Sequence, residues 1–209
     1  MGTSNFDEKA ATWDADPAKV ERAQVIGRAV RATVPLDPSM RLLEYGAGTG
    51  LVTEALRDAV GAVTLADTSA GMRDVMQAKV DAGAIPAARI WDLDLASDPP
   101  PDEQFDLVVT AMTLHHIHDL APVLSGFATL LAEGGHLCVV DLEEEEDGSF
   151  HTGDFDGHHG FRRPDLAAQL EAAGFRDITF RDCHHVEREG VAYPLFLATC
   201  VRRSDHTPS

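Results

Sequence analysis

The sequence predicts an α/β protein built on a doubly wound, mainly parallel sheet, and three features indicate this class. Short apolar segments alternate with segments whose apolar residues recur at helical spacing. The apolar segments, such as "HLCVVDL" (136–142), are nearly continuous, as is typical of parallel strands covered on both faces. A glycine-rich joint, "GAGTG" (46–50), lies where the first strand passes into a helix, and ligands of such sheets bind beyond the carboxyl ends of the strands.

The individual elements follow from periodicity and from chain breakers. Prolines and glycines mark the boundaries: Pro17 can open the first helix, Gly61 and Gly83 end the next two, and "PPPDEQ" can only be a loop. Strands are predicted at residues 41–45, 62–67, 88–95, 105–112, 136–142, 176–183 and 193–202. Helices are predicted at residues 18–30, 50–60, 70–83 and 120–135, with a short one from Pro164 to just before Gly174.

The domain organisation is a single domain with additions at both ends. We expect residues 1–35 to form an N-terminal lead-in, flexible up to residue 17, and a helix that together act as a lid. Residues 36–142 form the predicted cofactor-binding core. Residues 143–203 supply a polar loop rich in His and Gly, a helix and the closing strands, and residues 204–209 form a disordered tail.

The charge excludes several classes of partner. The formal net charge is -18 and the pI is about 4.7, so the surface repels phosphate backbones and anionic lipids; we expect neither nucleic acid nor membrane as a partner. The N-terminus carries no charged-then-apolar leader, and no apolar stretch approaches the length of a membrane span. Three widely spaced cysteines without a CxxC motif favour reduced thiols and a cytoplasmic location.

The spacing of glycines in the loop distinguishes between two kinds of cofactor site. A dinucleotide site requires G-x-G-x-x-G, whereas this loop reads G-x-G-x-G and continues with Leu51. Glu44 lies two residues before the first glycine, where its carboxylate would repel a pyrophosphate and would suit a cationic or hydrogen-bond-donating ligand. Gly46, Gly48 and Gly50 let the backbone turn sharply and approach that ligand.

"LLEYGAGTG" (42–50) resembles the first motif of the class I S-adenosylmethionine-dependent methyltransferases, and the resemblance extends over roughly residues 40–142. The matching segments are "VTLAD", "IWDLDL", "FDLVVTAMTLHHI" and "LLAEGGHLCVVD". The N-terminal "FDEKAATWD" is similar to the lead-in of small-molecule members of this superfamily. The family fold implies a seven-stranded sheet whose last strand is antiparallel.

The resemblance also implies which residues hold S-adenosylmethionine. Asp67 would bind the ribose hydroxyls, Asp94 the adenine amino group, and Met72 would pack on the adenine, although a core Met is an equal alternative. Asp92 is the substitute for Asp94, and Ser69 is an alternative helix cap to Asp67. The full set of implied cofactor residues is Trp13, Glu44, Tyr45, Gly46, Ala47, Gly48, Gly50, Asp67, Thr68, Met72, Asp94, Leu95, Thr110 and Ala111.

The histidines allow three interpretations. His115 and His116 in "TLHHI" would lie near the transferred methyl group and could accept a proton from the acceptor, so we name them as candidate catalytic residues. A metal site is the second interpretation, but "HTGDFDGHH" (151–159) fits no compact zinc spacing, so we predict no metal. The third interpretation is structural: helix caps, backbone hydrogen bonds and a mobile loop.

The predicted function is therefore methyl transfer from S-adenosylmethionine to a small-molecule acceptor by in-line displacement. An NAD(P)-dependent oxidoreductase is the first alternative, disfavoured by Leu51, by Glu44 and by the absence of a Tyr-x-x-x-Lys pair. A non-catalytic protein that binds S-adenosylmethionine or S-adenosylhomocysteine is the second, because in-line displacement requires no compulsory base.

Overall fold

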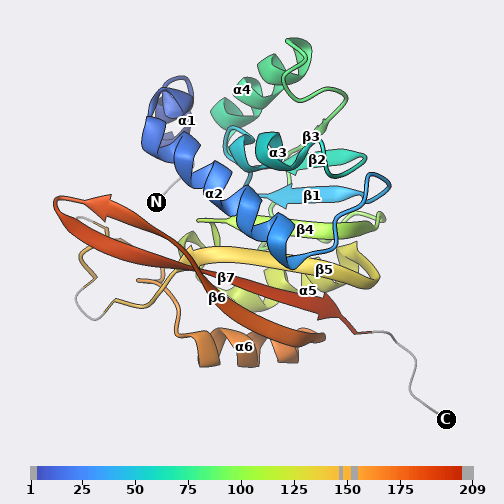
Figure 1. Ribbon diagram of the computed structural model, residues 1–209, viewed down its shortest axis with the longest axis vertical. Coiled ribbons are helices and arrows are strands. Elements are labelled where there is room, and N and C mark those ends of the chain that lie inside the picture. Colours follow the sequence, from blue (N-terminus) through green and yellow to red (C-terminus); the bar gives the residue numbers. More distant parts are fainter. Residues whose placement is uncertain (1–3, 146–147, 152–154, 204–209) are drawn as a thin grey trace.

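The computed structural model describes residues 4–145, 148–151 and 155–203 and forms a single seven-stranded sheet with helices on both sides (Figure 1). The strand order is β3-β2-β1-β4-β5-β7-β6. The strands are β1 (Leu42–Tyr45), β2 (Val63–Ala66), β3 (Arg89–Trp91), β4 (Phe105–Ala111), β5 (Leu131–Leu142), β6 (Phe175–Arg188) and β7 (Val191–Arg202). The helices are α1 (Ser4–Ala10), α2 (Pro17–Thr33), α3 (Leu51–Leu56), α4 (Ala70–Asp81), α5 (Leu120–Leu130) and α6 (Arg163–Ala172), with short 3-10 turns η1 (Trp13–Ala15) and η2 (Leu114–His116).

The pairing confirms the predicted sheet. The five strands β3, β2, β1, β4 and β5 run parallel, and β7 is antiparallel to both of its neighbours, β5 and β6. β6 and β7 form a long hairpin whose turn, Glu189 and Gly190, has positive φ at both positions. Such a turn matches the right-handed twist of paired strands. The carboxyl ends of β1, β2, β4 and β5 therefore meet at one edge of the sheet.

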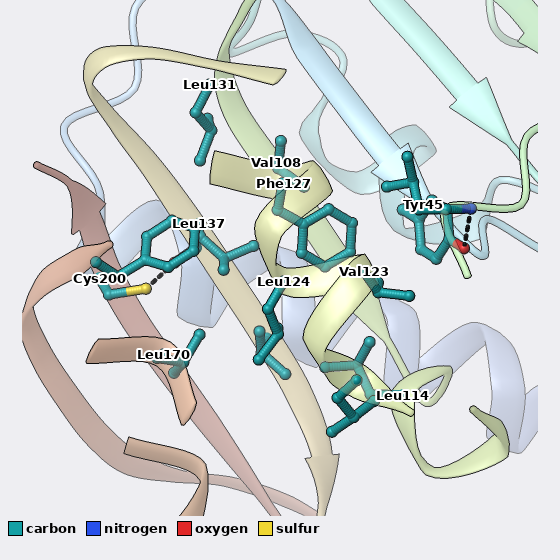
Figure 2. Close-up of a cluster of buried hydrophobic side chains, with 14 of the residues drawn as sticks. Tyr45, Val108, Leu114, Val123, Leu124, Phe127, Leu131, Leu137, Leu170 and Cys200 are labelled. Atoms are coloured by element: carbon teal, nitrogen blue, oxygen red, sulfur yellow. Dashed lines mark hydrogen bonds between the residues drawn. The ribbon is translucent and has the colours of Figure 1, made fainter. Parts of the chain in front are cut away.

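Two apolar layers enclose the sheet because successive residues of each strand point to opposite faces. Figure 2 shows one layer, in which Phe127 of α5 and Leu170 of α6 pack on Val108 and Leu137 of the sheet. The other layer packs Ile26 of α2 and Leu56 of α3 against the alternate strand residues, including Leu42, Leu107 and Val140. Both faces of the central strands are fully buried, as their continuous apolar sequence predicts.

The N-terminal segment differs from the expected flexible lead-in. Residues 4–15 form α1 and η1, and side chains tie both turns to the core. Asp7 Oδ1 accepts hydrogen bonds from Ser69 Oγ (2.6 Å) and Gly71 N (2.9 Å) at the start of α4, and Asp14 Oδ1 accepts one from Thr49 Oγ1 (2.5 Å) in the glycine loop. The sequence prediction was wrong here because these contacts are all made with residues far away in the chain.

Element lengths also required correction. β3 ends at Trp91, not at residue 95, because Asp94 Oδ1 accepts a hydrogen bond from Ala96 N (3.0 Å) and closes a turn. α3 ends at Leu56, five residues before Gly61, and α5 ends at Leu130, where β5 begins by pairing Leu131 with Phe105. The β6–β7 hairpin extends further than predicted, from 175 to 202. The predicted tail, 204–209, lies outside the described residues.

None of the helices in the described ranges is long and apolar enough to cross a lipid bilayer.

Candidate functional site

The glycine loop leaves β1 with three left-handed backbone conformations. Gly46, Gly48 and Gly50 have φ of 66°, 57° and 81°, which other residues rarely adopt. A Cβ on Gly46 would overlap Thr113, and one on Gly50 would come within 2.9 Å of Ile85. Among the described residues, no atom lies within 4 Å of a Cβ placed on Gly48. Gly46 and Gly50 are thus required by packing, whereas Gly48 presents its backbone to open space, where a ligand fits.

Asp67 lies against this loop, as the sequence predicts for a ribose-binding carboxylate. Its Oδ2 accepts a hydrogen bond from Gly48 N (2.8 Å), and its Oδ1 accepts one from Ser69 N (2.9 Å). Ser69, not Asp67, caps α4 by accepting from Met72 N (3.2 Å), which settles the alternative cap in favour of Ser69. Burial raises the pKa of Asp67 above its usual value, against the effect of these two backbone hydrogen bonds.

Glu44 is enclosed beneath the loop, with 3% of its surface exposed. Its Oε2 accepts a hydrogen bond from Thr53 N (2.9 Å), so the carboxylate holds the first turn of α3. Burial, opposed by the Thr53 hydrogen bond, raises the pKa of Glu44 from 4.5 to about 7. Thr53 is therefore a structural partner of Glu44 at the point where the loop joins α3. This contact is separate from the predicted place of Glu44 in the cofactor site.

The replacement Glu44→Gln is expected to make stability less dependent on pH. Because the folded pKa of Glu44 is raised, folding loses stability as pH rises from about 4.5 to about 7, and the variant avoids this loss. Relative to the parent, the variant should gain ~2–3 kcal/mol in free energy of unfolding between pH 5 and pH 8. Urea unfolding at both pH values measures this, with exposed Glu171→Gln as the control; a difference independent of pH would contradict it.

The remaining residues that the resemblance assigns to the cofactor differ in their exposure and in their partners. Asp92 forms an ion pair with Arg73 (2.9 Å), which leaves Asp94, a half-buried carboxylate beyond β3, as the freer acid. Leu95 is among the implied cofactor residues, and its backbone N–H donates to Tyr45 Oη (3.1 Å), as the dashed line in Figure 2 marks. Met72 is buried, Ala47 is buried and Thr68 is exposed.

The ends of β4 and β5 carry the polar groups of the second half of the site. Thr110 Oγ1 is buried without a hydrogen-bond partner in the described part of the chain, and Ala111 is half-buried beside it. Thr113 Oγ1 donates to Gly46 O (3.2 Å) or Ala111 O (3.1 Å), which joins the segment after β4 to the glycine loop. Thr110 and Ala111, two of the predicted cofactor residues, therefore lie next to the glycine loop.

The two candidate catalytic histidines differ in their surroundings. His115 is buried; its Nδ1 lies 2.6 Å from Asp141 Oδ1, and its backbone N–H donates to Asp141 Oδ2 (3.3 Å). His116 is half-buried beside it, with ring centroids 4.0 Å apart. Burial, with the neighbouring His115 and His151, lowers the pKa of His116 to about 3. The carboxylate of Asp141 therefore fixes His115 in one orientation, whereas His116 is a weak proton acceptor.

Several site residues lie outside the sequence prediction. Asp141 is the penultimate residue of the fifth strand, in "CVVDL", and an acid near the carboxyl end of an apolar strand is a signal that the sequence carries. Asp7 and Asp14 come from "FDEKAATWD" and His151 from "HTGDFDGHH", but neither pattern marks these particular residues as site residues. Lys79 Nζ binds Asp14 (2.5 Å), Glu54 (2.6 Å) and the carbonyl of Thr49 (2.9 Å), which fixes the loop from α4.

Trp13 lies on the N-terminal segment, half-buried, with Lys19 Nζ 4.0 Å from its ring centre. Phe6 lies between Trp13 (ring centroids 6.2 Å apart) and His116 (5.3 Å). The N-terminal aromatic residues thus reach the carboxyl edge of the sheet, the edge at which the glycine loop and the histidines lie.

Comparison with known proteins assigns the family. A family model described as a methyltransferase domain matches residues 19–179, so the chain belongs to this methyltransferase family. The prediction of a class I methyltransferase domain of the S-adenosylmethionine-dependent type is confirmed. The open cradle at Gly48 and the adjacent carboxylate of Asp67 are consistent with that cofactor.

The curated relatives match this chain over only part of their own length. An uncharacterized methyltransferase of Schizosaccharomyces pombe is 33% identical over 64% of this chain and 46% of its own. A hybrid PKS-NRPS synthetase of Aspergillus flavus is 31% identical over 57% of this chain and 3% of its own. The chain thus spans less than half of these relatives.

Solved structures share the fold at low identity. The N-methyltransferase NodS of Bradyrhizobium japonicum, in complex with S-adenosylhomocysteine, has a TM-score of 0.74 and 17% identity, covering 96% of this chain and 98% of NodS. A phosphoethanolamine N-methyltransferase of Haemonchus contortus has a TM-score of 0.75 and 13% identity, covering 98% and 61%.

Proposed function

We propose that this protein transfers the methyl group of S-adenosylmethionine to a small-molecule acceptor and that the His115–Asp141 pair takes up the acceptor's proton. The observation that carries the proposal is this buried pair at the carboxyl ends of β4 and β5, joined to the glycine loop through Thr113. A proton acceptor fixed next to the cofactor loop assists transfer whenever the acceptor atom, such as a hydroxyl or acidic carbon, must lose a proton.

The cofactor is proposed to bind over the open backbone of Gly48. Bound S-adenosylmethionine supplies a methyl group activated by its sulfonium. Asp67 would turn from the Gly48 N–H to the ribose hydroxyls, and Asp94 would accept from the adenine, because Asp92 is paired with Arg73. Thr110 and Ala111 would contact the amino acid part, where Thr110 Oγ1, which has no partner among the described residues, gains a hydrogen bond.

His115 is the proposed base, and His116 the proposed wall of the acceptor site. The Asp141 carboxylate holds Nδ1 of His115 as the proton-bearing nitrogen and leaves Nε2 as the acceptor. His116, with its pKa lowered to about 3, would take a proton poorly near neutral pH. Of the two candidates that the sequence offers, His115 is the one whose ring is hydrogen-bonded to a carboxylate among the described residues.

The acceptor is proposed to be small. The formal charge of -18 disfavours nucleic acid, and Haemonchus contortus phosphoethanolamine N-methyltransferase was solved in complex with phosphomonomethylethanolamine, a small molecule. Residues 1–35 are proposed to act as the lid, since Asp7 and Asp14 tie that segment to α4 and to the glycine loop. Three free cysteines favour the proposed cytoplasmic location.

Calorimetric titration with S-adenosylmethionine, S-adenosylhomocysteine and NAD in parallel tests the cofactor. We expect both sulfur compounds to bind and NAD not to bind; binding of NAD alone would favour an oxidoreductase. Transfer of a labelled methyl group to a panel of small hydroxyl, amine, thiol and carbon-acid acceptors then tests catalysis. Tight cofactor binding with no transfer to any member would favour a non-catalytic binding protein.

The variant Asp67→Ala is expected to weaken S-adenosylhomocysteine binding by ~1–3 kcal/mol, or roughly 5–150-fold, because the ribose loses a buried acceptor. Calorimetry measures the affinity, and Asp74→Ala, which removes an exposed carboxylate on the helix that follows, α4, is the matched control. An affinity within twofold of the parent would limit Asp67 to supporting the loop through Gly48 and Ser69.

A further inference from the structure

We propose that His115, His116 and His151 form a binding site for a divalent transition-metal ion of the zinc type. One potential ligand atom from each of these three side chains lies within 4.8 Å of those from the other two. The sequence prediction of no metal depended on spacing within residues 151–159. The structure instead combines two histidines that follow β4 with one from the loop after β5, a combination that no local spacing could indicate.

The nitrogen atoms in this cluster are available to a ligand. Nδ1 of His116 and Nδ1 of His151 are buried and have no hydrogen-bond partner among the described residues. Nδ1 of His115 is taken by Asp141, which leaves Nε2 of that ring. Buried polar atoms are nearly always partnered, so two unpartnered imidazole nitrogens in one cluster indicate a missing ligand. Three imidazoles, with a fourth position open to water or to a bound molecule, suit Zn²⁺.

Neighbouring side chains hold the three imidazole rings in defined positions. Asp141 accepts from His115 Nδ1 (2.6 Å), His115 N (3.3 Å) and Leu142 N (2.8 Å), so the carboxylate is rigidly held. A carboxylate that orients a metal-binding imidazole in this way also makes the imidazole a stronger ligand. On the opposite side, the Phe155 ring stacks on His151, with centroids 3.6 Å apart and planes 6° apart.

His151 is anchored by the residues that precede it. Phe150 is buried, its ring lies edge-on to Tyr193 (5.1 Å), and its N–H donates to the Glu145 carboxylate (2.9 Å). Ser149 Oγ lies 2.9 Å from Tyr193 Oη. These contacts fix the backbone of the loop against β7 and direct His151 toward the other two rings. Nitrogen atoms on a tetrahedral zinc are about 3.3 Å apart, so closure requires a shift of roughly 1.5 Å, within the reach of side-chain rotation.

A proton and a metal ion would compete for Nε2 of His115. A metal-loaded protein would therefore not use this histidine as the base of the proposed function, and the two states can be measured separately. The metal site does not depend on the cofactor, since none of its three ligands comes from the glycine loop or from α4.

Titration of the metal-stripped, tag-free protein with Co²⁺, followed by visible absorption and then by competition with Zn²⁺, tests the site. We expect one ion per chain, with the intense d–d bands of four-coordinate Co²⁺. His151→Ala and His116→Ala should each weaken binding at least tenfold, and Asp141→Asn should weaken it roughly 10–100-fold. The matched control is the double variant His184→Ala/His185→Ala, which removes an adjacent pair of histidines on β6.

Unchanged Co²⁺ affinity in the His116 and His151 variants, or loss of binding in the β6 control, would overturn the proposal. Binding of several ions per chain that no variant alters would also overturn it, because the acidic surface alone would explain it. His151→Ala is the decisive variant, since it changes a loop and its folding can be checked by circular dichroism. Binding of S-adenosylhomocysteine by metal-free protein is scored separately, so failure of the metal site and failure of the proposed function are distinguishable.

Discussion

Replacement of Gly48 with valine is expected to abolish cofactor binding while leaving the protein folded. No described atom, chain neighbours aside, lies within 4 Å of a Cβ placed on Gly48, so the added side chain extends from the loop into the space proposed for the cofactor. The loss should be on the order of 100-fold or more in affinity, equivalent to roughly 3 kcal/mol. Calorimetric titration with S-adenosylhomocysteine measures it directly.

The control for Gly48→Val must reproduce its backbone strain. The φ of Gly48 is 57°, and a residue with a side chain loses ~1–2 kcal/mol in this region. Gly174, beyond α6, also has a positive φ (96°), and within the described structure no atom lies within 4 Å of its Cβ position. Gly174→Val should therefore lose comparable stability and keep full affinity. Gly48→Val protein that binds normally would refute the placement of the cofactor on this loop.

Replacement of His115 with glutamine is expected to lower the rate of methyl transfer by ~10²–10⁴-fold, the usual contribution of a positioned base. Affinity for S-adenosylhomocysteine should stay within about threefold of the parent, because no cofactor contact is assigned to His115. Single-turnover transfer to an acceptor found in the screen, at saturating cofactor, measures the rate.

Two further readouts separate a base from a structural histidine. The rate of the parent should be independent of added imidazole, because its own His115 ring fills the site. Added imidazole should restore part of the variant's rate by entering the space left by the ring. His118→Gln is the matched control: His118 is an exposed neighbour paired with Asp156 (3.1 Å), and its loss should leave the rate unchanged. A His115→Gln rate within threefold of the parent would contradict the base assignment.

Most of the fold could be predicted because its signals are local. The apolar runs at 42–45, 105–111 and 136–142 are buried on both faces, and a parallel sheet follows from that property alone. The glycines at 46, 48 and 50 are needed because three left-handed conformations occur in five residues. Element ends were less predictable: β3 ends early at a turn made by Asp94, and β5 starts early because Leu131 pairs with Phe105.

The sequence by itself determined the sheet, the glycine loop, the position of Asp67 and the methyltransferase class, because these depend on periodicity and on short-range spacing. Only the tertiary structure decided the ordered N-terminal segment, the enclosure of Glu44 and the convergence of His115, Asp141 and His151. The N-terminal contacts and the histidine cluster join segments more than twenty residues apart, and all three features depend on desolvation and on hydrogen bonds that exist only when the chain is folded.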